Sequence, residues 1–334
     1  MAKKTTGVSG ISPLTVFDLA EGLFLGHALV AIERLGILDS LRRPMTLESL
    51  ATKHGVDREI LGYILPLLAA RTKMIAQRSR RYQITKTFNE TTRFVLLQYV
   101  GAYGRNAIEL PGILRNPSTA AEFIDHEQHS RAFDCAMPHQ TDALGDLVLQ
   151  RAVGAVFDIG CGTGSLLLYL ATRINGFRGW GIDNNPWMCK AARSRAAKAG
   201  KARRITILEG DSRSLTKQVS RSVADRIQAV TASGVANEFF SDGTSRAIAW
   251  LTELKRVFPG AMLFIEDYYG QLGYGHRVPP KHITVHDFVQ VISGQGVPPH
   301  SLPEWKKIYQ AAQCEFVKEF RGPKSFTFIH MVRL

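Results

Sequence analysis

The stretch Val156-Phe-Asp158-Ile-Gly160-Cys-Gly162-Thr-Gly164 decides the fold of this chain. Its apolar first half predicts the end of a buried strand, and the apolar run 166–172 that follows predicts a helix. Three glycines at alternate positions allow a tight turn and let a ligand approach the bare backbone. The N-terminus of the helix presents N–H groups that have no partner within the helix. We therefore predict a strand, a ligand-binding turn and a helix in this order.

The sequence from about residue 152 onward alternates apolar strands with helical stretches. Strands are predicted at 155–159, 179–183, 205–209, 227–233 and 262–268, and helices at 166–172, 187–199 and 244–257. Buried apolar strands separated by helices are typical of a parallel sheet with right-handed crossovers. We therefore predict an α/β fold with a Rossmann-like sheet, although the hydrophobic period does not give the order of its strands.

The amino-terminal part of the chain shows helices followed by a short hairpin. The apolar spacing within 14–41 predicts a helix that ends near Gly36. Thr46 and Asp57 are predicted to cap two further helices, and two strand-like runs flank a basic turn within 74–85. This is the winged-helix pattern. The predicted parts are a mainly helical winged-helix domain over 1–92, a helical linker and substrate lid over 93–145, and the Rossmann-like domain over 146–334.

The composition is that of an ordinary folded protein. The chain has 334 residues and is 45% hydrophobic and 21% charged, which excludes collagen-like and disordered classes. No apolar run approaches the roughly 18 residues of a membrane helix, and the start lacks the apolar core of a secretory signal. The four cysteines show no metal-ligand spacing, so we expect free thiols in the cytoplasm.

The net charge is strongly positive, with 42 Lys and Arg against 29 Asp and Glu, or +13. A basic balance fits nucleic acid, an anionic membrane or an acidic substrate, and it also fits simple solubility. The basic clusters at 78–81 and 190–204 contain no interleaved aromatic residues. We therefore interpret them as solvated faces and expect neither a membrane nor a nucleic-acid partner.

Two further strand ends carry acids that suit a nucleoside. Asp183 ends the second predicted strand, where a carboxylate can accept both hydroxyls of a ribose. Asp211 follows the third and could accept a hydrogen bond from an adenine amine. Asp158 would fix the glycine turn. Because the turn lacks G-x-G-x-x-G and a basic residue, an adenosine with an amino-acid sulfonium fits better than a pyrophosphate. The alternatives are a Rossmann dehydrogenase and a doubly wound domain without a nucleotide.

These residues resemble class I S-adenosylmethionine (SAM) methyltransferases, whose first motif is D-x-G-x-G-x-G. The resemblance implies SAM as cofactor. It also implies cofactor contacts from the glycine turn and the next three strand ends: Asp158, Gly160, Gly162, Gly164, Asp183, Asn184, Asp211, Ser212 and Ser233. The amino-terminal pattern looks like the winged-helix module of small-molecule O-methyltransferases, which implies a homodimer. The segment 131–137 resembles the linker of that family, whose Phe133 and Met137 would lie over the substrate; their alternative is ordinary helix core.

The fourth strand ends in Asn237-Glu238, where the O-methyltransferases carry His-Asp with the His as general base. A neutral Asn cannot take a proton, so this position lacks an imidazole base. An amine, an enolisable carbon acid or an already ionised hydroxyl remain as acceptors. Asn237 and Glu238 are the candidate catalytic residues, and Glu238 would orient an amine or act as base; its alternative is a helix N-terminal acid.

The last third is similar to bacterial C-methyltransferases of α-keto acids, through 258–267 and 296–305. Some members of that group hold iron with two histidines, which would fall at Asn237 and near Ile292, so no metal is expected here. His282 and His286 have the i, i+4 spacing of metal ligands, but a third ligand is missing. We assign them to the wall of the acceptor pocket, where neighbouring basic residues would suit an anionic acceptor.

The sequence therefore predicts a cytoplasmic, homodimeric, SAM-dependent methyltransferase that acts on a small molecule in specialised metabolism, with carbon or nitrogen favoured over oxygen. The main alternative is a nucleic-acid methyltransferase or a winged-helix DNA-binding protein, which would use Arg78, Arg80 and Arg81 on phosphates. The fourth strand end lacks the Asn/Asp-Pro-Pro-aromatic turn of nucleic-acid amino-methyltransferases. A catalytically dead scaffold is disfavoured because every acid on the cofactor side is present.

Overall fold

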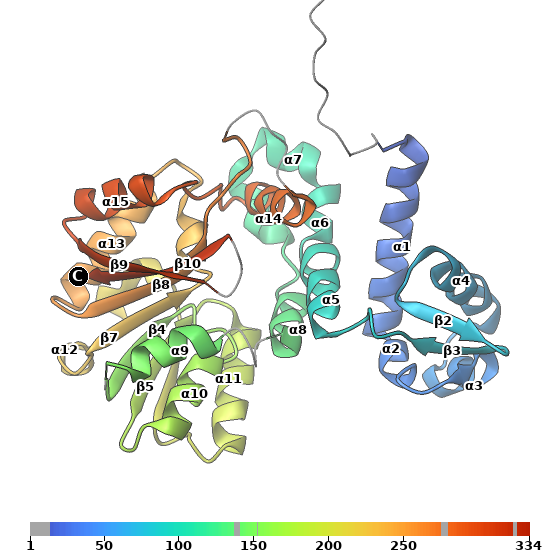
Figure 1. The fold of residues 1–334 in the computed structure, drawn as a ribbon, viewed down its shortest axis with the longest axis horizontal. Helices are drawn as coiled ribbons and strands as arrows, with labels where there is room; N and C mark the ends of the chain where they lie inside the picture. Colours follow the sequence, from blue (N-terminus) through green and yellow to red (C-terminus); the bar gives the residue numbers. More distant parts are fainter. Residues whose placement is uncertain (1–13, 137–140, 152, 275–279, 323–325) are drawn as a thin grey trace, which may run out of the picture. The chain divides into compact units, whose positions relative to one another are not determined.

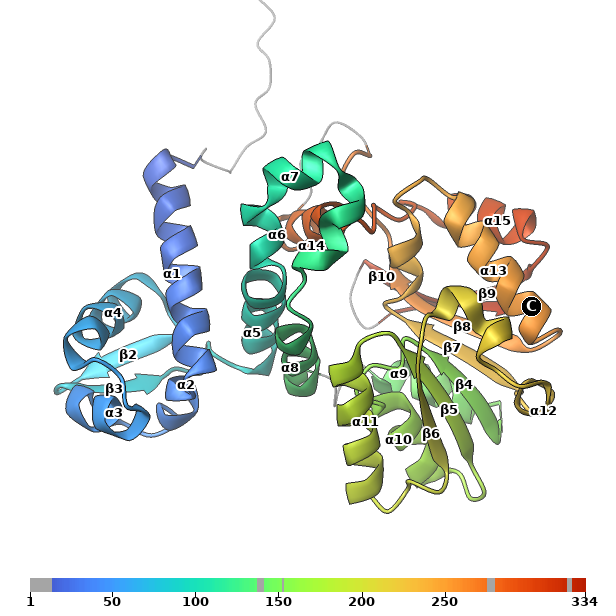
Figure 2. The same ribbon diagram turned by 180° about the vertical axis from the view of Figure 1, so that it is seen from behind.

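The computed structural model describes residues 14–136, 141–151, 153–274, 280–322 and 326–334. The chain folds into two compact units, Met1–Thr92 and Arg93–Leu334, which we describe separately. The second unit contains both the helical segment at 93–145 and the large sheet (Figures 1 and 2).

The first unit combines four helices with a small antiparallel sheet. Its elements are α1 (Val16–Arg34), α2 (Ile37–Ser40), β1 (Met45–Thr46), α3 (Leu47–His54), α4 (Arg58–Arg71), β2 (Ile75–Arg78) and β3 (Arg81–Ile84). The strand order β1-β3-β2 and the hairpin between β2 and β3 give the helices and wing that the sequence predicts.

Local chemistry explains most of the boundaries in this unit. Thr46 Oγ1 accepts a hydrogen bond from the Ser49 N–H, and Asp57 Oδ1 accepts one from the Ile60 N–H, so both predicted caps are present. The first predicted helix ends near Gly36 as expected, and the rest of the stretch forms the short helix α2. Gly36 has a φ of 73°, a left-handed conformation that ends α1 and starts α2.

The second unit begins with short helices. They are α5 (Glu90–Val95), the π-helix η1 (Leu96–Ala102), α6 (Gly104–Ile108), α7 (Leu110–Arg115), the 3₁₀ helix η2 (Pro117–Phe123), α8 (His126–Ala136) and α9 (Thr141–Leu149). This segment is as helical as predicted. Pro117 stands at the start of η2, where its missing N–H costs no helical hydrogen bond.

A seven-stranded sheet forms the centre of the second unit, in the order β6-β5-β4-β7-β8-β10-β9. Its strands are β4 (Ala155–Ile159), β5 (Arg178–Asp183), β6 (Ile205–Glu209), β7 (Ala229–Ser233), β8 (Met262–Tyr268), β9 (Glu315–Arg321) and β10 (Thr327–Arg333). The first five are parallel, and β10 is antiparallel to both β8 and β9. The α/β fold with a Rossmann-like sheet is confirmed.

Helices cover both faces of this sheet (Figures 1 and 2). One core joins α9, α10 (Ser165–Arg173) and α11 (Pro186–Lys198) to the strands, and a second core joins α13 (Ser245–Val257) and α15 (Leu302–Ala311). The remaining elements are the 3₁₀ helices η3 (Ser212–Lys217) and η4 (Ala236–Phe239), α12 (Arg221–Ala224) and α14 (Lys281–Ile292). Both sheet faces are therefore apolar, and polar chemistry is left to the carboxyl edge of the strands.

Within the described residues, no helix combines the length and the apolar character that a membrane crossing requires.

Candidate functional site

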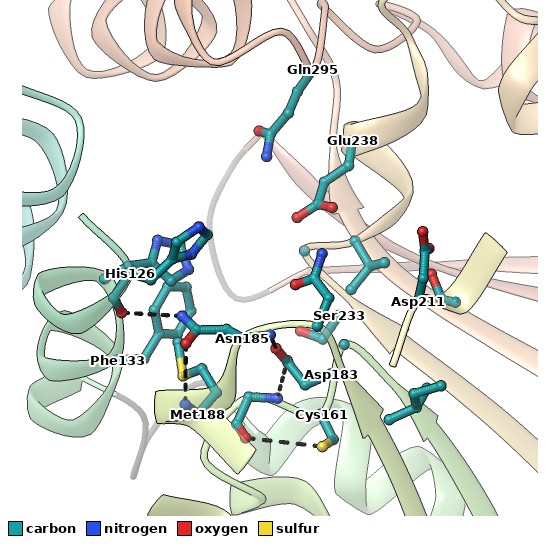
Figure 3. A pocket seen from close by; sticks show the side chains of 18 of the residues that line it. His126, Phe133, Cys161, Asp183, Asn185, Met188, Asp211, Ser233, Glu238 and Gln295 are labelled. Carbon is teal, nitrogen blue, oxygen red and sulfur yellow. Dashed lines mark hydrogen bonds between the residues drawn. The ribbon is translucent and has the colours of Figure 1, made fainter. Parts of the chain in front are cut away.

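A cavity of about 280 Å³ lies in the second unit, at the carboxyl ends of β4, β5, β6 and β7. This volume is close to the lower end of the range for small-molecule sites, about 300–1,000 Å³. All the predicted cofactor residues except Gly164 line it. Figure 3 shows acidic side chains from three strand ends converging on the cavity, opposite side chains from α8.

The glycine turn forms the floor of the cavity in a conformation that favours glycine. Gly160, Gly162 and Gly164 have φ values of 61°, 52° and 74°. A Cβ on Gly160 would lie 2.3 Å from Val235 Cγ2, so this glycine also allows β4 and the turn after β7 to pack closely. Gly164 is the N-cap of α10 and faces Ala192 rather than the cavity.

Asp183 at the end of β5 fixes the glycine turn. Its Oδ2 accepts a hydrogen bond of 2.9 Å from the Gly162 N–H, and its Oδ1 accepts one of 2.8 Å from the Asn185 N–H. Burial raises the pKa of this carboxyl, and the two backbone N–H groups oppose the shift. Asn184 lines the cavity beside it, while Asn185 caps α11 and donates to the His126 carbonyl.

Asp158 and Ser233 lie deeper in the cavity wall. Asp158 Oδ1 accepts a hydrogen bond of 2.7 Å from Thr231 Oγ1 on the adjacent strand. Burial raises the pKa of Asp158 to about 7, with a smaller contribution from the charge of Asp183. Ser233 Oγ donates to Glu266 Oε2 at 2.9 Å, so both side chains are held in place by the sheet.

Asp211 follows β6 and forms an ion pair with Arg213, at 2.8 Å between Oδ2 and Nη2. Burial acts to raise the pKa of Asp211, but the hydrogen bonds and the charge of Arg213 outweigh it and lower the pKa. Ser212 and Arg213 line the cavity as well. Arg213 was not predicted as a cavity residue, because its pairing with Asp211 depends on the path of the chain after β6.

The two predicted catalytic residues take different positions. Glu238 lines the cavity and its carboxylate points into it (Figure 3). Asn237 does not line the cavity: its N–H donates to Asp267 Oδ2 and its Nδ2 donates to Gln290 Oε1, both at 2.9 Å. Its side chain, 5% exposed, joins η4 to α14.

The Glu238 side chain is exposed and faces the cavity interior. The protein that surrounds the cavity reduces the hydration of the carboxyl, which raises its pKa to about 8. The charges of Asp183, Asp267 and Asp211 act in the same direction, and that of Arg213 opposes them.

Helix α8 supplies the wall opposite Glu238. Phe133 lines the cavity as predicted, and His126 and His129, which were not predicted, line it too. Burial lowers the pKa of His129 to about 4, and its Nδ1 lies 3.4 Å from Tyr103 Oη. The spacing of residues 126, 129 and 133 places all three on one helix face, which was the available signal. Met137 lies outside the described residues.

The predicted pocket histidines lie elsewhere. His282 and His286 are on α14 and are not among the residues that line the cavity. His286 Nδ1 is 2.9 Å from Tyr99 Oη, and its ring packs 4.5 Å from the ring of Tyr268. His282 packs against Phe326. The i, i+4 spacing puts both histidines on one side of α14, but it does not specify whether that side lines the cavity.

In the part of the chain that the structure describes, no group of three His, Cys, Asp or Glu side chains is arranged to hold a metal ion.

Comparison with known proteins agrees with this geometry. Residues 156–258 match a family model described as a methyltransferase domain. The chain is also 24% identical over 249 residues to "Methyltransferase ungE'" of Aspergillus campestris, which spans 70% of this chain and 69% of that protein.

Several solved structures share the fold over nearly the whole chain. The mitomycin 7-O-methyltransferase MmcR has a TM-score of 0.72 at 17% identity and covers 95% of this chain and 96% of its own. A Nostoc punctiforme protein named as an O-methyltransferase has a TM-score of 0.75 at 14% identity, covering 97% and 100%. The riboflavin-derivative N,N-dimethyltransferase RosA from Streptomyces davawensis has a TM-score of 0.59 at 18% identity, covering 95% and 98%.

Residues 156–258 therefore form a methyltransferase domain, and the whole chain has the fold of these methyltransferases, as the sequence predicts. None of these relatives is named as a C-methyltransferase, so the similarity to α-keto acid C-methyltransferases stays a prediction.

Proposed function

We propose that this enzyme methylates a nitrogen or carbon atom of a small molecule in specialised metabolism, with Glu238 as the base. The observation that carries the proposal is the exchange of roles at the end of β7. Asn237, at the position of the imidazole base, is tied to Gln290, while Glu238 faces the cavity. A carboxyl of raised pKa removes a proton from an ammonium or a carbon acid more effectively than an ordinary carboxylate does.

The residues of the cavity fit SAM as cofactor. The left-handed glycine turn brings bare backbone to the cavity, and Asp183 and Asp211 supply acceptors for ribose hydroxyls and an adenine amine. To accept from adenine, Asp211 would share its carboxylate with Arg213. Bound SAM supplies an electrophilic methyl group on a sulfonium.

The α8 side of the cavity supports a role in acceptor binding. The ring centroids of Phe133 and His129 lie 5.0 Å apart, and Gln295 points an amide into the cavity (Figure 3). Aromatic surface with a few polar groups is typical of small-molecule sites. These side chains would orient the acceptor beside Glu238, and alignment alone contributes several kcal/mol to such a transfer.

The experiment uses acceptors that share one carbon skeleton and differ only in carrying an amine, an enolisable ketone or a hydroxyl. Each is incubated with the enzyme and methyl-labelled SAM, and the products are identified by mass spectrometry. We expect label on the amine or the carbon acid. Label on the hydroxyl compounds alone would refute the proposed acceptor class.

A second candidate is O-methylation of an acidic hydroxyl. The structure of MmcR, an O-methyltransferase, shares the fold, and His126 places an imidazole on the cavity wall of this chain. The same panel of acceptors separates this candidate from the first.

We also propose a homodimer that forms through the first unit, in the cytoplasm. The amino-terminal half of α1 exposes large apolar side chains, including Phe17 at 83% and Phe24 at 69%. Exposed apolar surface of this kind marks interaction sites.

The four cysteines are free thiols, as expected in a reducing compartment. Among the described lining residues of the cavity, Arg213 and Arg246 are each paired with an acid, which gives no support to an anionic acceptor.

A further inference from the structure

Glu238 differs from the other acids of the cavity because its carboxylate has no partner among the described residues. Four carboxylates line the cavity in the described part of the chain, and three of them are engaged. Asp158 is bound by Thr231, Asp183 by two backbone N–H groups and Asp211 by Arg213. No hydrogen bond or ion pair joins the Glu238 carboxylate to any described residue. A carboxyl that shares a cavity with other acids is favoured in its protonated form unless it meets a cation.

The charges around Glu238 favour its protonated form. The acids that act on it come from three strand ends, and Arg213, whose charge opposes them, already pairs with Asp211. Further groups on the same cavity wall are neutral or paired: the neutral ring of His129, the phenol of Tyr103, and Arg246 in its pair with Asp242. His126 also lines this wall. Reduced hydration and the neighbouring acids together raise the pKa of Glu238 to about 8, so the ligand-free protein favours its protonated form at neutral pH.

A positive charge that enters the same cavity reverses this preference. An opposite charge within about 4–6 Å favours the ionised form of a carboxyl. Glu238 and Asp183 line one cavity, so a sulfonium nucleoside whose ribose rests on Asp183 brings its charge into the space that Glu238 faces. The demethylated product S-adenosylhomocysteine has a neutral thioether at the same position.

We propose that Glu238 releases its proton when the sulfonium form of the cofactor binds and keeps it when the thioether form binds. The base then becomes available only while the methyl donor is present. This inference rests on the proposed function, because it needs the cofactor in this cavity and Glu238 at the acceptor.

The reaction balances in charge and protons. The bond between the methyl group and sulfur breaks as the bond between the methyl group and the acceptor forms, so the sulfonium charge is lost. The acceptor N–H or C–H proton passes to a Glu238 carboxylate oxygen. The methylated acceptor, the thioether and the Glu238 carboxyl are then all neutral. Glu238 is again in the protonated form that the ligand-free cavity favours, and the next sulfonium to bind displaces that proton to solvent.

The test is titration calorimetry of SAM and S-adenosylhomocysteine at pH 7 in phosphate and in Tris, whose ionisation enthalpies differ. The slope of binding enthalpy against ionisation enthalpy gives the number of protons released. For the wild type we expect SAM to release about one proton more than S-adenosylhomocysteine. The amino-acid ammonium and carboxylate are common to both ligands, so their contributions cancel.

Two variants assign the proton. Glu238→Gln keeps the size of the side chain but cannot titrate, so the difference between the two ligands should vanish while both still bind. Glu315→Gln, on the exposed edge strand β9, should behave as the wild type. Equal proton numbers for both ligands in the wild type, or an unchanged difference in Glu238→Gln, would overturn the inference. Failure of both ligands to bind the wild type would instead overturn the proposed function together with it.

Discussion

At the scale of single residues, the site depends on side chains and backbone groups whose conformation or protonation state is fixed by their neighbours. Gly160 is one such group. Its φ is 61°, and a Cβ at this position would lie only 2.3 Å from Val235 Cγ2, which leaves no room for a side chain. The tight turn after β4 therefore requires glycine at this position.

Gly160→Ala should lower the free energy of unfolding by about 1–3 kcal/mol, since it combines steric overlap with an unfavourable φ. Adding Val235→Ala should recover part of the loss, because it removes the overlap and leaves the φ strain. Chemical denaturation of the two single variants and the double variant measures both terms. Strictly additive losses would show that the two residues do not meet.

His330 shows how burial fixes a protonation state outside the cavity. The side chain is fully buried, with Tyr309 Oη 2.8 Å from Nδ1 and Tyr269 Oη 3.2 Å from Nε2. Burial lowers its pKa to about 3, so the folded protein keeps the ring neutral. Below the unfolded value of about 6.5 the unfolded state binds more protons, and stability falls as the pH falls toward 3.

We expect His330 to account for a loss of about 2 kcal/mol in unfolding free energy between pH 7 and pH 5. Asp158 and Asp267, whose pKa values are raised to about 7, act in the opposite direction, so the comparison must be with a variant. His330→Gln should be less stable than the wild type at pH 7, and the gap should narrow at pH 5. Urea denaturation at the two pH values checks this, and a gap that stays constant would contradict it.

At the scale of elements, helix α1 divides into two halves of different environment. Leu29, Val30 and Ile32 in its carboxyl half are buried, whereas large apolar side chains in its amino half are exposed: Val16, Phe17, Leu19, Leu23 and Phe24. Removing apolar surface from water contributes about 25 cal/mol per Å² of favourable free energy. A second copy of the chain that covers these side chains would therefore form a stabilised dimer.

Phe17→Asp combined with Phe24→Asp should convert a dimer to a monomer, which sedimentation equilibrium measures directly. The control is Leu114→Asp on α7, a side chain that is 75% exposed in the second unit. If the wild type sediments as a monomer, or if both variants sediment as dimers, α1 is not the interface.

The elements also show where sequence reasoning succeeds and where it stops. The glycine turn, the acids at the strand ends and the helix caps follow from local patterns, and the structure contains all of them. The pairing of Asp211 with Arg213 and the rotation of Asn237 away from the cavity depend on the path of turns and on contacts with distant elements. Contacts between residues far apart in the chain leave no regular spacing in a single sequence.

At the scale of the whole molecule, the net charge does not describe the charge of the cavity. The chain carries +13, but acids predominate among the described cavity residues and the described arginines are paired. An acidic cavity suits a cofactor that carries a positive sulfonium. The fold and the acidic character of the cavity are therefore both consistent with the proposed cofactor.

The most direct test of the account is calorimetric binding of S-adenosylhomocysteine to the wild type and to Asp183→Ala. We expect one site per chain in the wild type and an affinity at least about 10-fold lower in the variant, because the substitution removes both a ribose acceptor and the anchor of the glycine turn. Thermal melting shows whether the variant is folded. A folded Asp183→Ala protein with wild-type affinity would contradict the assignment of this cavity to the cofactor.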